Sequence, residues 1–290
     1  MIGATWKRDS RSAAIGCLIA MLVLSRPALV AASRERIVSL TPSVTETLFA
    51  LGAGPEVVGV SQYCDYPPAV GKLPRVGSFL TPNIEAIVAL RPTLVIGSWI
   101  SSDLPAFQSL NSMGYPTLIV KDNSLEQIEE SIRAIGDRIG RSEQARDLLA
   151  SINQHLDDVR RRLEGVKLRT VLMVVGHQPL VAVGSGTYLD ELLHIAGGIN
   201  IADGTGDSWP HLSIEYIVAM KPEVILDGQM GDDPTAPQRF WSEYPGIPAV
   251  QNHRIYSYPE DLTLHPGPRV WQSLEVLASR IHPEAAANPP

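Results

Sequence analysis

The chain contains 290 residues and carries a formal net charge of −7, from 24 Lys and Arg and 31 Asp and Glu. This length exceeds what one small core serves and suits two domains of ordinary size. The acidic balance argues against a protein that binds nucleic acid. At the start of the chain, basic residues precede an apolar run over 13–24, and Val30-Ala31-Ala32 offers the small residues of a cleavage site. Residues 1–32 are therefore predicted to be a secretory signal peptide.

This first segment bears on location and on cysteine chemistry. Twelve apolar residues are too few to span a bilayer, and most of the run follows Cys17, which argues against lipoprotein cleavage there. Cleavage after residue 32 would remove four basic residues and one acidic residue and bring the net charge to −10. Cys64 would then be the only cysteine, so no internal disulfide is expected. We expect a periplasmic or extracytoplasmic protein, with the segment either cleaved or kept as an anchor.

Residues 33–141 are predicted to form an N-terminal α/β lobe, because short apolar strands alternate with helices. The expected strands are 36–40, 57–60, 93–96 and 117–120. The expected helices are 41–51, 84–90 and 104–113, placed by capping residues, glycines and the position of Pro92. Short apolar strands between helices indicate a parallel sheet.

Residues 142–165 are predicted to form one connecting helix. Its apolar residues have helical spacing and a glycine ends it. A helix of roughly twenty residues is about 30 Å long at ~1.5 Å rise per residue. Such a helix between two lobes is a stiff spacer, so large hinge closure is not expected.

Residues 166–290 repeat the plan as a C-terminal α/β lobe. The expected strands are 170–175, 224–226 and 255–258. The expected helices are 189–196, one that begins near Ser213, and 269–280, with a loop over 262–268 and a frayed tail from 283. The predicted fold class is therefore α/β, with two similar lobes, each around a central parallel sheet, joined by one long rigid helix.

One segment occurs twice and supports this division. Phe79–Ile96 returns as Trp209–Leu226 at an offset of 130 residues, with an aromatic residue at the start of each copy. A glutamate, Glu85 or Glu215, occupies equivalent positions. A period this long, present twice, indicates two lobes of like topology rather than a solenoid. The functional site is expected between the lobes.

Catalytic motifs are missing from the sequence. It contains no GxSxG, GxxxxGK[ST], HExxH or CxxC, and a trio such as Ser39, His177 and Asp190 is one that any chain of this length offers. All seven histidines lie in the connecting helix or the second lobe, none at ligand spacing, and His194 is interpreted as a packed or surface residue. An ion held between the lobes would need Tyr63 or Asp65 from the first lobe. We expect no enzyme, no catalytic residue, no metal site and no cofactor.

Aromatic residues mark the loops at the lobe edges. Tyr63, Phe79 and Trp209 are each next to Gly, Pro or polar residues, as cleft residues are, whereas Tyr66 and Trp99 fit a core equally well. Ligand sites in open α/β sheets form beyond the carboxyl ends of the strands. Facing rings favour a large, flat, partly apolar ligand. The polar residues expected beside them are His211 and the 261–265 loop.

Four segments together resemble a known family. Residues 36–48, 58–68, 83–96 and the Trp209-Pro210 segment are similar to periplasmic cobalamin-binding proteins of ABC importers. These belong to the helical-backbone metal-receptor family of cobalamin, siderophore and haem receptors. The resemblance covers residues 34–282 and implies a class III periplasmic-binding-protein fold. It also implies a monomeric receptor that captures its ligand between the lobes and delivers it to an ABC permease dimer.

The resemblance implies cobalamin, or another corrinoid, as the transported ligand. The residues that it implies for binding are Tyr63, Phe79, Trp209, Asp261 and His265. His265 occupies the position of a family arginine, and Val181 that of a family phenylalanine, so a ferric siderophore or haem receptor remains the alternative. An iron-bearing ligand could use Tyr63, His211 or His265. The alternative of a different class is an extracytoplasmic enzyme that uses the same cleft.

The resemblance also assigns a role to the repeated glutamates. It implies that Glu85 and Glu215 dock into arginine pockets of the two permease subunits. Two carboxylates at equivalent points of a pseudo-symmetric protein suit a twofold symmetric partner. Each also favours the positive end of its own helix, which contributes about 0.3–1 kcal/mol.

Overall fold

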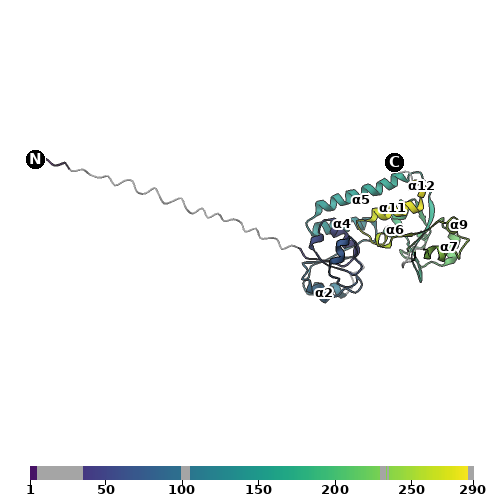
Figure 1. The fold of residues 1–290 in the computed structure, drawn as a ribbon, viewed down its shortest axis with the longest axis horizontal. Coiled ribbons are helices and arrows are strands. Elements are labelled where there is room, and N and C mark those ends of the chain that lie inside the picture. The colour runs from purple at the N-terminus through teal and green to yellow at the C-terminus, as the bar shows by residue number, and fades with distance from the viewer. Residues whose placement is uncertain (5–34, 99–104, 229–232, 234, 287–290) are drawn as a thin grey trace. The chain divides into compact units, whose positions relative to one another are not determined.

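The structure is a computed structural model that describes residues 1–4, 35–98, 105–228, 233 and 235–286 (Figure 1). Most of the predicted signal peptide, with Cys17, lies outside the described residues, as does Trp99. Residues 1–34 and residues 35–290 form separate units. None of the described helices has the length and apolar character needed to cross a membrane.

The first lobe is built on a four-stranded parallel sheet in the order β2-β1-β3-β4. Its strands are β1 (Ile37–Ser39), β2 (Val57–Val60), β3 (Leu94–Ser98) and β4 (Thr117–Val120). Every residue of β3 is buried, because a central parallel strand is covered on both faces. The four strands lie where the sequence predicts them.

Helices cover both faces of this sheet. They are α1 (Pro42–Ala50), α2 (Ile84–Ala89), α3 (Pro105–Ser112) and α4 (Leu125–Arg138), with 3-10 turns η1 (Gly54–Glu56) and η2 (Pro68–Lys72). The sequence interpretation did not include α4. This helix begins at Ser124, whose side chain accepts from the backbone N–H of Gln127, and it buries Ile128, Ile132 and Ile135.

The connecting helix is α5 (Ser142–Arg162), of 21 residues. It packs against α4 at the first lobe and against α11 (Val270–Ile281) at the second (Figure 1). The predicted helix extended to residue 165, but the chain leaves the helix at Leu163 and turns at Gly165, which has a φ of 76°.

The second lobe has a mixed sheet in the order β6-β5-β8-β9, with β7 also paired to β5. Its strands are β5 (Arg169–His177), β6 (Leu180–Ala182), β7 (Gly198–Asn200), β8 (Val224–Gly228) and β9 (Ile255–Tyr258). The expected parallel sheet is corrected at one pair, since β5 and β6 are antiparallel. Only two residues connect them, and a parallel crossover needs a dozen or more.

The helices of the second lobe complete the repeat. They are α6 (Tyr188–Ile195), α7 (Ile214–Met220), α8 (Ala236–Trp241), α9 (Pro248–Gln251), α10 (Glu260–Thr263), α11 and α12 (Pro283–Ala286), with a 3-10 turn η4 (Asp203–Thr205). The loop expected over 262–268 therefore begins inside α10. Helices α2 and α7 lie in the two copies of the segment that recurs at an offset of 130 residues, and each is followed by a buried strand.

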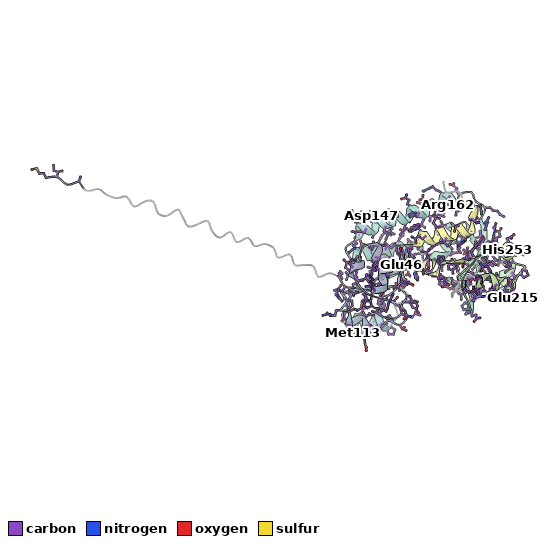
Figure 2. The ribbon with its side chains drawn as sticks, viewed as in Figure 1. Glu46, Met113, Asp147, Arg162, Glu215 and His253 are labelled. Atoms are coloured by element: carbon purple, nitrogen blue, oxygen red, sulfur yellow. The ribbon has the colours of Figure 1, made fainter. Side chains whose placement is uncertain are left out.

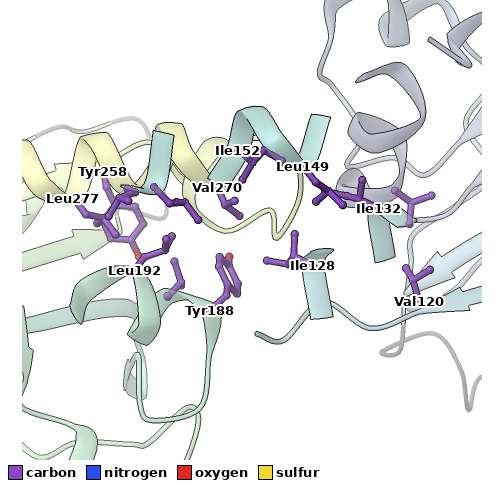
Figure 3. Packing of buried hydrophobic residues seen from close by; sticks show 14 of the residues in the cluster. Val120, Ile128, Ile132, Leu149, Ile152, Tyr188, Leu192, Tyr258, Val270 and Leu277 are labelled. Carbon is purple, nitrogen blue, oxygen red and sulfur yellow. The ribbon is translucent and has the colours of Figure 1, made fainter. Parts of the chain in front are cut away.

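One apolar core continues through the connecting helix (Figure 3). Ile128 and Ile132 of α4 and Leu149 and Ile152 of α5 belong to the same cluster as Val270 of α11. Two smaller clusters occupy the remaining sheet faces, one in each lobe. The stiffness of this connection stays a prediction. The boundaries at 141 and 165 remain sequence-based divisions.

Candidate functional site

Two loops of the first lobe bring Tyr63 and Phe79 together. Their ring centroids are 5.5 Å apart and the rings are tilted by 56°. Tyr63 is 48% exposed, so one face of the pair is open. The backbone N–H of Gln62 donates to the carbonyl of Gly77 at 2.9 Å and ties the two loops.

Gly77 is required for this arrangement. It has a φ of 92°, and a Cβ there would lie 2.7 Å from the carbonyl oxygen of Thr81 and 2.9 Å from the N–H nitrogen of Asn83. Only glycine allows that backbone conformation and that close approach. The turn is closed by Ser78, whose hydroxyl accepts from the Thr81 N–H at 2.9 Å. Phe79 is thus held by a rigid turn directly ahead of α2.

Trp209 is presented by a loop that runs along β6. The Ala182 N–H donates to the Pro210 carbonyl at 3.0 Å, and the Gly184 N–H donates to the Ser208 carbonyl at 2.9 Å. A Cβ on Gly184 would lie 1.9 Å from the carbonyl oxygen of Asp207, so this approach requires glycine. Trp209 is 39% exposed, and within the described residues it makes no ring contact with Tyr63 or Phe79.

Asp261 and His265 belong to a polar network that joins the lobes. Glu46 of α1 is 3% exposed. Its Oε2 accepts from Nε of Arg269 at 2.7 Å, and its Oε1 accepts from Nη2 of Arg269 at 2.6 Å. Nδ1 of His265 lies 3.3 Å from the same Oε1. Nη2 of Arg269 also donates to the backbone carbonyl of Asp261 at 2.9 Å. Arg269 was not among the predicted site residues.

Tyr66 and Asp261 mark the exposed side of this network. The Arg269 guanidinium lies 4.0 Å from the centroid of the Tyr66 ring, which is 44% exposed. A cation over an aromatic face adds about 0.5–1 kcal/mol at an exposed site. The Asp261 side chain is exposed, whereas His265 is turned toward Glu46 with 20% of its side chain exposed.

A second polar group lies at the carboxyl ends of β5 and β8. Asp227 is fully buried; its carboxylate contacts Nε2 of His177 at 2.8 Å and accepts from Nε1 of Trp241 at 2.5 Å. Burial raises the pKa of Asp227 and also that of Glu260, which follows β9. The sequence signal for this group was one aspartate at the end of an otherwise apolar strand.

The trio of Ser39, His177 and Asp190 does not assemble. Each has a separate partner: Ser39 accepts from Thr45 at 2.7 Å, His177 pairs with Asp227, and Asp190 accepts from Asn200 at 2.8 Å. No nucleophile and base from this trio are therefore within hydrogen-bond distance of one another.

Glu85 and Glu215 occupy matching places in the two lobes. Each is the second residue of its helix, is exposed, and follows an N-cap, Asn83 or Ser213, whose side chain accepts a backbone N–H. Figure 2 shows Glu215 at the surface of the second lobe. Its own backbone N–H and the Ser213 hydroxyl lower the pKa of Glu215. Across the described residues, neither glutamate forms an ion pair with a Lys, Arg or His side chain.

Comparison with known proteins gives one consistent family. A family model described as periplasmic binding protein matches residues 37–262. An uncharacterized ABC transporter substrate-binding lipoprotein of Bacillus subtilis is 33% identical over 259 residues, which cover 86% of this chain and 81% of that protein. The vitamin B12-binding protein of Vibrio cholerae is 29% identical over 248 residues, which cover 85% of this chain and 89% of that protein.

Solved structures extend the likeness to heme-binding proteins. The apo form of the periplasmic heme-binding protein of Roseiflexus sp. RS-1 matches with a TM-score of 0.78 and 30% sequence identity. The match covers 87% of this chain and 99% of that one. The two-lobe fold is thus the one that these relatives share.

Proposed function

This chain belongs to the family of periplasmic binding proteins, and from that premise we propose that it binds cobalamin, or another corrinoid, and delivers it to an ABC permease. Its relatives are substrate-binding proteins of ABC transporters, so a small-molecule ligand and a permease partner follow from the family. The observation that carries the corrinoid proposal is the set of solvent-accessible rings, of which Tyr63 and Trp209 are half-exposed and Phe79 is partly buried. Tyr63 and Phe79 lie on one lobe, and Trp209 lies at the equivalent place in the other.

These rings suit a flat macrocycle. An open aromatic face buries a large apolar area and adds about 0.5–1.5 kcal/mol of geometry-dependent contact. Phe79 and Trp209 start the two copies of the 130-residue repeat, so related loops present them. A ligand held by both would contact each lobe with the same kind of side chain.

The carboxylates of the second lobe favour a corrinoid over haem. The rim of the corrin ring carries neutral amide side chains, whereas haem carries two propionate carboxylates. Asp261 is exposed and Glu260 is partly buried on the second lobe, and Arg269, which stacks on Tyr66, is already paired with Glu46. Amides can donate hydrogen bonds to these carboxylates, but propionates would meet charges of the same sign.

Haem is the second candidate, and one observation favours it. The Tyr63 phenol is half-exposed beside an aromatic ring, and a phenolate is a known type of axial ligand to haem iron. A ferric siderophore would use the same loops. With a corrinoid, haem or a ferric siderophore as ligand, the proposed protein is a monomeric carrier that performs no catalysis. The alternative of an enzyme differs in that an enzyme would alter its ligand.

Calorimetric titration with cyanocobalamin, with haemin and a ferric siderophore as matched ligands, tests the proposal. We expect one-to-one submicromolar binding of cobalamin and weak or no binding of the other two. Trp209→Ala should weaken cobalamin binding by about 10- to 100-fold, because a large buried aromatic contact is lost. Met113→Ala is the control, since Met113 is an exposed apolar residue of the first lobe (Figure 2), and it should leave the affinity within twofold.

Each outcome decides between the candidates. Binding of haemin or of the ferric chelate without cobalamin would overturn the corrinoid and keep a receptor of this family. A chemically altered cobalamin after release, detected by mass spectrometry, would instead indicate the enzyme.

A further inference from the structure

Three potential metal ligands converge in the second lobe. Asp190 and His194 are four residues apart on α6, which puts them on one helix face. Asp203 approaches them from η4. One ligand atom from each residue lies within 4.8 Å of the other two. Throughout the described ranges, no other group of three or more His, Cys, Asp or Glu residues meets this condition.

The hydrogen bonds of His194 determine which nitrogen is available. Nδ1 lies 2.9 Å from the backbone carbonyl of Asp190, and a carbonyl oxygen can only accept, so Nδ1 carries a proton and donates. In the neutral ring, Nε2 then carries no proton and presents a lone pair. This nitrogen lies 3.2 Å from Oδ2 of Asp203. Two acceptors at this distance require a cation between them, either a proton on Nε2 or a metal ion.

Among the described residues, His194 is the basic side chain that can balance these two carboxylates, and it does so only when protonated. Asp190 is 6% exposed, whereas 38% of the Asp203 side chain is exposed. Oδ1 of Asp203 is buried and has no hydrogen-bond partner. No Lys or Arg forms an ion pair with either carboxylate in the part of the chain that the structure describes. An unpartnered buried oxygen beside a second carboxylate is costly unless a cation is bound.

The spacing between His194 and Asp203, together with the supporting contacts, fits a transition metal. Zn–N and Zn–O bonds of about 2.0–2.2 Å put two tetrahedral ligand atoms about 3.3 Å apart, and the Nε2–Oδ2 distance is 3.2 Å. Imidazole with carboxylates suits Zn²⁺ and its first-row neighbours better than Ca²⁺ or Mg²⁺. The Asn200 side chain holds Oδ1 of Asp190 at 2.8 Å, and the Asp190 carbonyl orients His194, as outer partners of metal ligands do.

We propose that Asp190, His194 and Asp203 bind a divalent transition-metal ion, with water completing the coordination. The ion would connect α6 to η4, whose Asp203 is six positions before Trp209. The histidine spacing did not reveal this site, because two of its three ligands are carboxylates and one of them comes from a separate turn.

The test uses the purified untagged protein, stripped with EDTA and freed of chelator. Titration with Zn²⁺ by calorimetry, and with Co²⁺ by visible absorption, should give one equivalent of binding with micromolar or tighter affinity. His194→Ala and Asp203→Asn should each weaken Zn²⁺ binding by at least about tenfold, as loss of a ligand does. His253→Ala is the matched control, because His253 is an exposed histidine elsewhere in the same lobe (Figure 2), and it should retain binding within twofold.

Circular dichroism in the presence of EDTA keeps the test decisive, since it shows whether each variant is folded without metal. If a variant is unfolded, the intensity of the Co²⁺ absorption bands of the wild-type protein still reports four- or five-coordinate binding to nitrogen and oxygen. No stoichiometric Zn²⁺ binding by the wild-type protein, or equal binding by a folded His194→Ala variant, would overturn the site. The contacts would then be a salt bridge between protonated His194 and the two aspartates.

Discussion

At the scale of single residues, Asp122 is a carboxyl group whose ionisation the fold opposes. It lies two residues after β4, and its Oδ2 accepts from the Ser43 hydroxyl at 3.1 Å. Burial raises the pKa of Asp122 to about 6, against an ordinary value of 3.8. The folded protein therefore keeps this proton up to about pH 6, whereas the unfolded chain releases it near pH 3.8. The free energy of unfolding therefore falls as the pH rises from about 3.8 to about 6. Above this window the folded protein carries the whole destabilisation from the buried, ionised Asp122.

Asp122→Asn should raise the free energy of unfolding at pH 7 by about 1–3 kcal/mol, because the variant has no buried charge. It should also remove this residue's share of the decline in stability between pH 4 and 6. Urea unfolding at several pH values measures both effects. Asp147→Asn is the control, since Asp147 is exposed on α5 (Figure 2) and a change there stays within about 0.5 kcal/mol. An Asp122→Asn variant no more stable than wild type at pH 7 would contradict the argument.

Residue types alone indicated the aromatic positions but not their partners. Tyr63, Phe79 and Trp209 could be chosen because Gly, Pro and polar neighbours are typical of exposed loops. The pairing of Tyr63 with Phe79 depends on a hydrogen bond between Gln62 and Gly77, which are 15 positions apart. No local pattern contains that contact.

At the scale of elements, α2 and α7 are equivalent helices that present equivalent carboxylates. Each begins after a side-chain cap, places its glutamate in the first turn, and buries the isoleucine two positions later, Ile87 or Ile217. This shared geometry supports the proposal that Glu85 and Glu215 contact the two subunits of a permease. Favourable placement at the positive end of a helix is compatible with the same role.

The paired substitution Glu85→Ala and Glu215→Ala should separate docking from ligand capture. We expect unchanged cobalamin affinity, because both side chains are exposed and belong to helices rather than to the aromatic loops, and a loss of permease-dependent uptake of tenfold or more. Calorimetry measures the affinity, and uptake into vesicles that contain the permease measures coupling. Uptake equal to wild type, or a large loss of cobalamin affinity, would count against the docking role.

Sequence patterns identified the longer elements and missed some short ones. The helix α4 was overlooked although Leu125, Ile128, Ile132 and Ile135 have helical spacing and Ser124 offers a cap, so its signal was present. The strands β6 and β7 have three residues each. A period of two cannot be recognised over three residues, and these strands form only because β5 offers an edge to them.

At the scale of the whole molecule, the connection between the lobes combines an apolar core with a buried ion pair. Leu149 and Ile152 of α5 pack in a cluster that includes residues of both sheets (Figure 3). Beside it, Glu46 of the first lobe is held by Arg269 of the second. Removal of one partner from a buried pair is strongly destabilising, because the other charge stays buried.

Arg269→Met should lower the free energy of unfolding by about 2–4 kcal/mol, somewhat less than for a fully isolated charge because His265 remains beside Glu46. Addition of Glu46→Leu to this variant should recover part of the loss. Urea unfolding measures both. Arg162→Met is the control: its ion pair with Glu275 joins α5 to α11 and is more exposed, at 20% and 37% of the two side chains (Figure 2), so its loss should cost less than that of the buried pair. Equal effects of Arg269→Met and Arg162→Met would refute the special role of the buried pair.

The sequence by itself determined the fold class, the two-lobe repeat, the connecting helix and the family. The first three follow from local periodicity, capping residues and a segment that recurs at an offset of 130 residues. The family follows from the resemblance of four segments to known receptors. Only the tertiary structure decided the Glu46–Arg269 connection, the antiparallel β6 and the convergence of Asp190, His194 and Asp203. Each of these depends on which distant segments meet in space, and packing of the whole chain, rather than any local pattern, fixes that choice.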